Sequence, residues 1–513
     1  MASSVIMSPT PPPASFQRQG GPLPARWWLV GTAVVALASP ASALAVEWTL
    51  TPRVTVSAEV TDNARLAPRG QEEADLIGTV SPGFTLRGEG ARSDTRIDYR
   101  LNSRFYLDDS RQGRTTHALR GRSNWELVDD TFFVNAGASR TEQVASILDP
   151  VGIGGSTPRG NLQETTSYSV SPMLRTRYGS FATQEVRYTY GATLNHQSNR
   201  QDSDYHRGEY VLNSGAAFNR PFWQVAGFYE EERFDNGLEG EFGQVSGTLG
   251  YRFGRSLRLF GVVGEDFNDY ATTREDDDGS FWQVGAGWAP TRVTNIEARY
   301  GERYFGKNRA LSVNHRSRRA TYRLSYDEGV SSTRQRREGP FAQLAEDAQF
   351  MTIDELLDRY TLEEIFLFAL NPQLGDEAFV EGFYFTRSWR AGWSYDTGRS
   401  VFGINLVQTE RESETQTNVG LFEDNRTQRG ANVFWQWRYG PRTTSLVSTG
   451  VTRTDFADSD REDDLWYLRA SVSRQLTPDT TASLAVRHQR RESNSADNEY
   501  RENAIIGTLT KEF

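Results

Sequence analysis

Hydrophobic and polar residues alternate along almost the whole chain from Val46 onward. In the clearest segment, Ile97, Tyr99 and Leu101 occupy one parity, whereas Arg96 and Arg100 occupy the other. A period of two is that of a β-strand with one apolar and one polar face. The pattern therefore predicts an all-β fold in which each strand separates an apolar environment from a polar one.

The same alternation recurs often enough to predict about 22 strands. The segments are 48–60, 76–86, 97–107, 119–127, 132–138, 168–178, 186–194, 210–218, 223–229, 245–253, 257–263, 282–288, 296–304, 311–315, 322–326, 383–395, 402–406, 433–439, 446–452, 466–476, 482–486 and 501–513.

The connections between these segments alternate in length. Short ones, such as 179–180 and 254–255, are followed by long polar ones, such as 143–163 and 331–381. Transmembrane barrels have short periplasmic turns and long extracellular loops, and an even strand number leaves both termini in the periplasm. Soluble sandwiches and propellers have shorter strands and no such alternation. We therefore expect a transmembrane antiparallel up-and-down β-barrel of about 20–22 strands. The short connection at 306–308 leaves the number open by two.

The composition is polar for a membrane protein, with 37% hydrophobic residues and a mean hydropathy of -0.62. A barrel accounts for this, because only alternate strand residues face lipid. The chain has no cysteine, which excludes disulfides and thiolate metal sites, and no cofactor is expected. The net charge of -10 argues against nucleic acid as a partner.

Residues 1–45 have the features of a disordered leader followed by a secretory signal peptide. Arg26 precedes an apolar run over 27–38, and small residues mark a cleavage site near Ala45. A membrane anchor is the alternative, but the run falls short of the roughly 20 residues that span a bilayer. The mature chain, 46–513, is then a single barrel.

The last strand closes on an aromatic carboxyl terminus. Ile505, Leu509 and Phe513 share one parity, which resembles the insertion signal of bacterial outer-membrane barrels; Lys511 departs from it. The resemblance implies location in the outer membrane of a Gram-negative bacterium. It also implies three partners: the barrel-assembly machinery, outer-membrane lipid and lipopolysaccharide.

One long connection contains a helical pattern. Over 352–370, residues such as Leu356, Tyr360 and Ile365 recur at helical intervals, and Pro372 then ends the pattern. The order of the turns places this insert on the extracellular side. Its apolar face needs cover, so it either folds into the barrel mouth as a constriction or packs on its own loop.

Several short blocks resemble a family of outer-membrane proteins associated with PEP-CTERM exopolysaccharide systems. They are VTDN at 60–63, VSPGF at 80–84, WAPT at 288–291 and the run over 304–326 that includes HRSRR at 315–319. The family has no established catalytic residues to carry over. The resemblance implies an outer-membrane location and a role near secretion or anchoring of surface polysaccharide.

Arginine is frequent at the positions expected to face the lumen. The candidates are Arg96, Arg100, Arg104, Arg120, Arg122, Arg175 and Arg177. A basic lumen lowers the barrier for an anionic polysaccharide, because guanidinium groups pair well with carboxylates. Alternatively, these arginines pair with Asp98 and Glu185 across strands and only fill the interior.

The sequence thus predicts a channel or secretion component for exopolysaccharide export. The alternatives are a structural or adhesive barrel without transport, and a general porin. The five histidines are scattered, with no spacing that suggests a catalytic triad. We therefore expect that the chain is not an enzyme.

Overall fold

The computed structural model describes residues 46–513, apart from 110–112, 147, 196–201, 236, 238, 273, 275, 333–334, 336–339, 352, 363, 366–382, 415–424 and 458. The predicted signal peptide, 1–45, and the end of the predicted helical insert, 366–370, lie outside the described residues.

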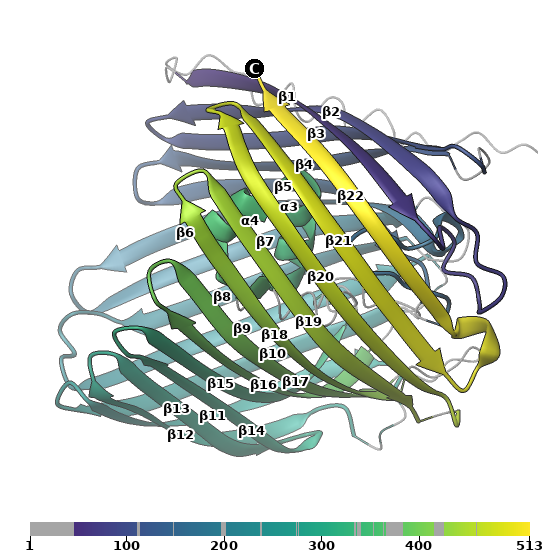
Figure 1. Cartoon of the computed structure of the whole chain (residues 1–513). Helices are drawn as coiled ribbons and strands as arrows, with labels where there is room; N and C mark the ends of the chain where they lie inside the picture. The colour runs from purple at the N-terminus through teal and green to yellow at the C-terminus, as the bar shows by residue number, and fades with distance from the viewer. Residues whose placement is uncertain are drawn as a thin grey trace, which may run out of the picture. The chain divides into compact units, whose positions relative to one another are not determined.

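Twenty-two antiparallel strands form one closed sheet (Figure 1). Each strand pairs with the next one in the chain, and β22 (Tyr500–Glu512) pairs with β1 (Glu47–Thr61). The closure continues to the last residue, where the Phe513 N–H donates to the Pro52 carbonyl at 2.9 Å. The predicted up-and-down barrel is confirmed, at the upper end of the expected strand number.

The remaining strands are β2 (Asp75–Gly90), β3 (Ser93–Tyr106), β4 (Arg114–Val128), β5 (Phe132–Val144), β6 (Leu162–Tyr178), β7 (Ala182–Asn195), β8 (Ser203–Ser214), β9 (Pro221–Phe234), β10 (Glu239–Phe253), β11 (Leu257–Tyr270), β12 (Gly279–Thr291), β13 (Thr294–Arg303), β14 (Gly306–Arg316), β15 (Ala320–Ser332), β16 (Phe383–Asp396), β17 (Ser400–Ser413), β18 (Arg426–Gly440), β19 (Thr443–Phe456), β20 (Glu462–Thr477) and β21 (Thr480–Ser493). Two short 3-10 helices are η2 (Arg159–Asn161) and η4 (Ala496–Asn498). Among the described residues, no helix has both the length and the apolar character needed to cross a membrane.

The connection between β13 and β14 is a tight turn. It consists of Tyr304 and Phe305, after which Gly306 adopts a φ of 100° that favours glycine. Phe305 is buried, and its ring centroid lies 5.2 Å from that of Phe385. The short outer connection that left the strand number open is therefore a real turn between two paired strands.

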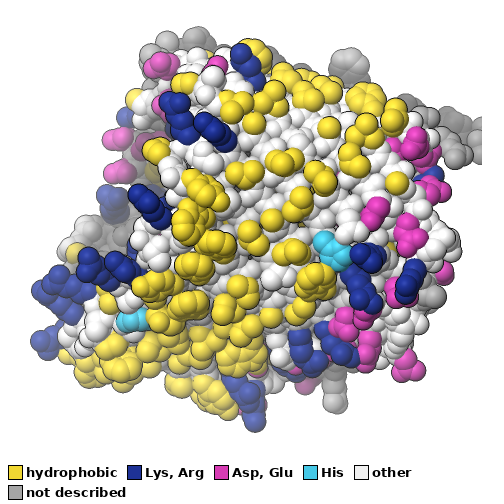
Figure 2. All heavy atoms as spheres, in the orientation of Figure 1, with side chains coloured by type: hydrophobic (Ala, Val, Ile, Leu, Met, Phe, Trp, Pro, Cys, Tyr) yellow, Lys and Arg dark blue, Asp and Glu magenta, His cyan; other side chains and the backbone are white. Residues whose placement is uncertain are grey.

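The two faces of the sheet have opposite character. In β17, Phe402, Ile404 and Leu406 are exposed, whereas the alternating Asn405 and Val407 are buried towards the lumen. Figure 2 shows hydrophobic side chains spread over the middle of the outer face, with most charged side chains towards its edges. An apolar band of this kind faces the hydrocarbon core of a bilayer in outer-membrane barrels.

The loop between β15 and β16 contains two helices, α3 (Pro340–Phe350) and α4 (Ile353–Arg359). A single helix over 352–370 was expected, but α4 ends at Arg359. Thr361 then starts a new turn as a capping box: the Glu364 N–H donates to Thr361 Oγ1 at 3.3 Å, and the Thr361 N–H donates to Glu364 Oε2 at 2.8 Å.

Candidate functional site

The loop that contains α3 and α4 folds back into the barrel; we call residues 340–365 the plug. Figure 1 shows both helices inside the ring of strands. The plug contacts β1, β3 and β4 through arginines, and it packs against β18 and β19 through Leu362. Since the plug comes from between β15 and β16, on the opposite side of the closed sheet from β4, it crosses the lumen to reach β1, β3 and β4.

The carboxyl end of α3 is held by two arginines of the wall. Arg53 Nη1 and Arg100 Nη2 donate to the Phe350 carbonyl at 2.8 and 2.7 Å. The last carbonyls of a helix have no partner within the helix and carry partial negative charge, so guanidinium groups stabilise them. Arg53 also forms ion pairs with Glu355 of α4 and with Glu512 of β22.

Asp347 of α3 is the acidic centre of the plug. Its side chain is 1% exposed and forms ion pairs with Arg120 of β4 and with Arg359, the latter at 3.1 Å. Tyr360 donates its hydroxyl to the same carboxylate at 2.5 Å. Arg120 in turn pairs with Asp98 of β3 at 2.8 Å. Buried charges of this kind are stable only when all are paired, so wall and plug depend on each other.

Apolar contacts hold the other side of the plug. Leu344, Leu356 and Ile365 form a small buried cluster within it. Leu362 packs against Phe434 of β18 and Leu446 of β19. The two predicted arrangements thus coexist, because the plug packs on itself and also extends into the lumen.

A second loop, 145–161 between β5 and β6, also folds inward. The Tyr500 hydroxyl donates to the Val151 carbonyl at 2.6 Å, and the Ile153 N–H donates to Gln489 Oε1 at 2.9 Å. Both loop residues are buried. The loop therefore lies against the inner faces of β21 and β22. These strands are separated from its own strands, β5 and β6, by β1 to β4.

A buried charge network lies beside this second loop. Arg487 of β21 pairs with Glu502 of β22 at 2.5 Å and with Glu59 of β1. Arg104 of β3 lies 3.3 Å from Glu59 and donates to the Gly155 carbonyl at 2.9 Å. The network ties the seam between the first and last strands to the inward loop.

The seven predicted lumen arginines fall into two groups. Arg100, Arg104 and Arg120 contact the inward-folded segments, as described above. The second group forms ion pairs within the wall: Arg96 with Asp98 at 3.0 Å, Arg175 with Glu185 at 3.2 Å and Arg177 with Asp130 at 3.5 Å. The seventh arginine, Arg122, lies on β4 two residues after Arg120. Some candidates thus pair across strands, as the second interpretation expected. Their role in transport stays a prediction.

Sequence reasoning missed Arg53, α3 and the inward course of loop 145–161. Arg53 does lie on the polar parity of its strand, so it was available as a lumen position. The partners of the loop, Tyr500 and Gln489, are remote in sequence, and only the three-dimensional fold brings them to it.

Two cavities lie between the plug and the barrel end that carries the short turns. One, of about 550 Å³, is lined by Arg53, Glu355 and Arg442. The other, of about 450 Å³, is lined by Arg316, Arg318, Arg319, Arg323, Arg359 and Arg438, together with Glu364 and Asp396. Arginines outnumber acidic residues in the second cavity, so it offers a basic surface next to α4.

An ion pair joins two connections at the opposite end of the barrel. Arg274, between β11 and β12, donates from Nη2 to Glu414 Oε1 at 2.7 Å, and its guanidinium lies 5.4 Å from the Phe385 ring centroid. The hydrogen bond to Glu414 raises the pKa of Arg274.

The described histidines have ordinary polar partners. His117 lies 2.8 Å from the Tyr99 hydroxyl, His206 lies 2.6 Å from the Tyr188 hydroxyl and His315 lies 2.8 Å from the Thr294 hydroxyl. His488 contacts the Asn503 side chain at 2.6 Å. These pairs join neighbouring strands, which is a structural role.

Comparison with known proteins identifies the fold. No protein-family profile and no curated protein matches this chain. Among solved structures, it is similar to the siderophore receptor PirA from Acinetobacter baumannii (TM-score 0.53, 9% identity, 90% of this chain and 80% of that chain). It is also similar to the FrpB iron transporter from Neisseria meningitidis, F5-1 variant (0.51, 10%, 90% and 82%). At such low identity the likeness shows the fold alone: a closed antiparallel β-barrel of 22 strands.

Proposed function

We propose that this chain is an outer-membrane channel of a Gram-negative bacterium through which an anionic exopolysaccharide leaves the cell. One observation carries the proposal: arginines of the wall hold carboxylates of a plug. Arg53 and Arg120 pair with Glu355 and Asp347. Guanidinium groups that bind the carboxylates of the plug can also bind the carboxylates of an acidic polymer once the plug has moved.

Release of the plug would then be an exchange of ion pairs. Removing Asp347 alone would leave Arg120 buried with a single acidic partner, Asp98, which is costly. A polymer that brings its own carboxylates to Arg120 and Arg53 avoids that cost. The basic cavity beside α4 would be its first binding place, because that cavity lies at the end with the short turns.

Two further observations support export through a plugged barrel. The resemblance to the PEP-CTERM-associated family points to exopolysaccharide as the substrate. Outer-membrane transporters with 22 strands have a plugged lumen, and the solved structures of similar fold include a siderophore receptor and an iron transporter. The fold by itself does not specify a substrate.

Conductance in planar bilayers tests the proposal. The intact protein should conduct little, and deletion of 339–375 should open a large anion-preferring conductance that an acidic oligosaccharide blocks. The double variant Arg53→Gln/Arg120→Gln should open partially and show weaker block. The matched control is Arg258→Gln, because Arg258 pairs with Glu297 in the wall. No conductance after deletion would favour a structural or adhesive barrel, and conductance without ion preference would favour a general porin.

A further inference from the structure

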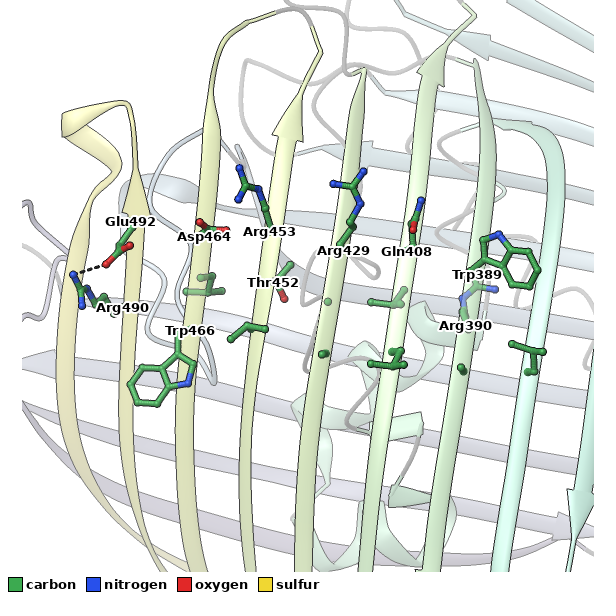
Figure 3. A pocket seen from close by; sticks show the side chains of 18 residues that line it. Trp389, Arg390, Gln408, Arg429, Thr452, Arg453, Asp464, Trp466, Arg490 and Glu492 are labelled. Atoms are coloured by element: carbon green, nitrogen blue, oxygen red, sulfur yellow. Dashed lines mark ion pairs between the residues drawn. The ribbon is translucent and has the colours of Figure 1, made fainter.

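A groove crosses the outward face of the barrel from β15 to β21 (Figure 3). Its volume is about 770 Å³. Trp389 of β16 and Trp466 of β20 stand at its two sides, with exposed fractions of 44% and 39%. Because both indoles face outward, the groove opens to the lipid and not to the lumen.

The floor of the groove is a row of small and aliphatic side chains in register. Ala391 pairs with Leu406, Leu406 with Ala431, and Ala431 with Val451. Each alanine leaves a hollow between larger neighbours. The floor is therefore an uneven apolar surface that methylene chains of a lipid can contact.

The next outward row, towards the long loops, is polar and has its two arginines side by side. Arg429 of β18 and Arg453 of β19 are directly opposed, and Figure 3 shows them side by side at the groove's edge. Like charges in this arrangement repel each other. Both reach the same carboxylate, Asp455, at 3.0 and 3.1 Å, and Arg453 also pairs with Glu462. Asp464 is the next residue of the row, opposite Arg453.

Two further arginines continue the floor row beyond Trp466, which pairs in register with Arg490. Arg490 of β21 pairs in register with Arg501 of β22. Glu492 forms an ion pair with Arg490. Arg490 thus lies at the end of the floor row, whereas Arg429 and Arg453 lie in the polar row, and all three are accessible because each is about half exposed.

We propose that this groove is a specific site for an outer-leaflet glycolipid with a phosphorylated sugar headgroup and several acyl chains. The acyl chains would lie over the row from Ala391 to Val451. A phosphate would accept hydrogen bonds from both Arg429 and Arg453 in place of Asp455, since guanidinium groups bind phosphate oxygens in a bidentate manner. The position next to the long loops selects the outer leaflet. This site is independent of the proposed transport function.

Native mass spectrometry of the purified full chain, with lipid A added to the detergent, tests the charge requirement. We expect the wild type to retain lipid A, and Arg429→Gln/Arg453→Gln to retain on the order of tenfold less, the loss expected for charge-assisted hydrogen bonds. The matched control is Arg233→Gln: Arg233 is exposed and paired with Glu231 on β9, away from the groove. Heat-modifiable mobility on gels verifies that each variant is folded.

Two further arms test the groove and the headgroup. Ala431→Trp should lower retention by filling the hollow at this alanine, whereas Ala286→Trp, in a separate outward groove on β12, should not. Lipid A without phosphates should bind weakly, and millimolar inorganic phosphate should not displace bound lipid. The proposal is wrong if the arginine double variant retains as much lipid A as Arg233→Gln, or if removal of the phosphates leaves binding unchanged.

Discussion

Arg120 of β4 and Asp347 of α3 form a buried ion pair between the barrel wall and a segment of the loop between β15 and β16. Each has a second partner, Asp98 for Arg120 and Arg359 for Asp347. The four side chains Asp98, Arg120, Asp347 and Arg359 therefore alternate in charge, and the central pair joins the wall to the plug. Breaking this pair tests how firmly the plug is held.

Arg120→Gln should loosen the plug without opening the barrel. Breaking one side of a buried pair costs roughly 3–5 kcal/mol, because the remaining charge stays buried. Hydrogen exchange should therefore accelerate in 340–365 and stay slow in β3 and β4. The double variant Arg120→Gln/Asp347→Asn should be less perturbed than the sum of its single changes, and strict additivity would show that the two side chains are not coupled.

Gln489→Leu should release the second inward loop. Gln489 accepts from the Ile153 N–H at 2.9 Å and donates to Ser156 at 2.7 Å and to Glu502 at 2.9 Å. Its loss leaves the Ile153 N–H unsatisfied, which costs about 1–3 kcal/mol. Hydrogen exchange at 151–157 measures the effect. Tyr500→Phe removes a single bond and should produce a smaller change; equal protection in wild type and Gln489→Leu would contradict the described contacts.

The effect of removing a lumen arginine on ion preference should depend on where that arginine lies. Arg100→Gln/Arg104→Gln, made in the plug-deleted protein, should reduce anion preference, because Arg100 then loses its plug contact and faces the open lumen, while Arg104 keeps its charge on the inner wall. Arg177→Gln should have little effect, since Arg177 is exposed near a short turn and lies 3.5 Å from Asp130. Reversal potentials in a salt gradient measure the preference. Identical potentials for all three proteins would remove these arginines from any selectivity role.

The alternation of residues predicted the strands, their outward faces and the closure, because lipid on one side and water on the other impose a period of two. Strand ends were predicted less well. The segment at 311–315 belongs to β14, which runs from Gly306 to Arg316, since backbone pairing continues where the side chains leave the apolar band.

The lumen was the part that the sequence could not specify. The pattern over 340–350 is interrupted by Glu346, Asp347 and Gln349, so no helix was expected there. Asp347 pairs with Arg120 and Arg359, and the apolar contacts of the same helix are limited to a small cluster around Leu344. A helix with charged partners has a weak amphipathic pattern, and the position of α3 depends on pairs such as Arg120 with Asp347.

Phe513→Ala should impair assembly more than any single lumen change. Ile505, Leu509 and Phe513 are all exposed on the outward face, as an insertion signal requires, and β22 must find β1 to close the barrel. Lys511 shares this face, with Nζ 5.2 Å from the Phe513 ring centroid, where it reaches the periplasmic interface. The folded, heat-modifiable fraction in outer-membrane preparations measures assembly. Tyr439→Ala removes an exposed aromatic ring elsewhere and should assemble normally; normal assembly of Phe513→Ala would show that the terminal strand is not the signal.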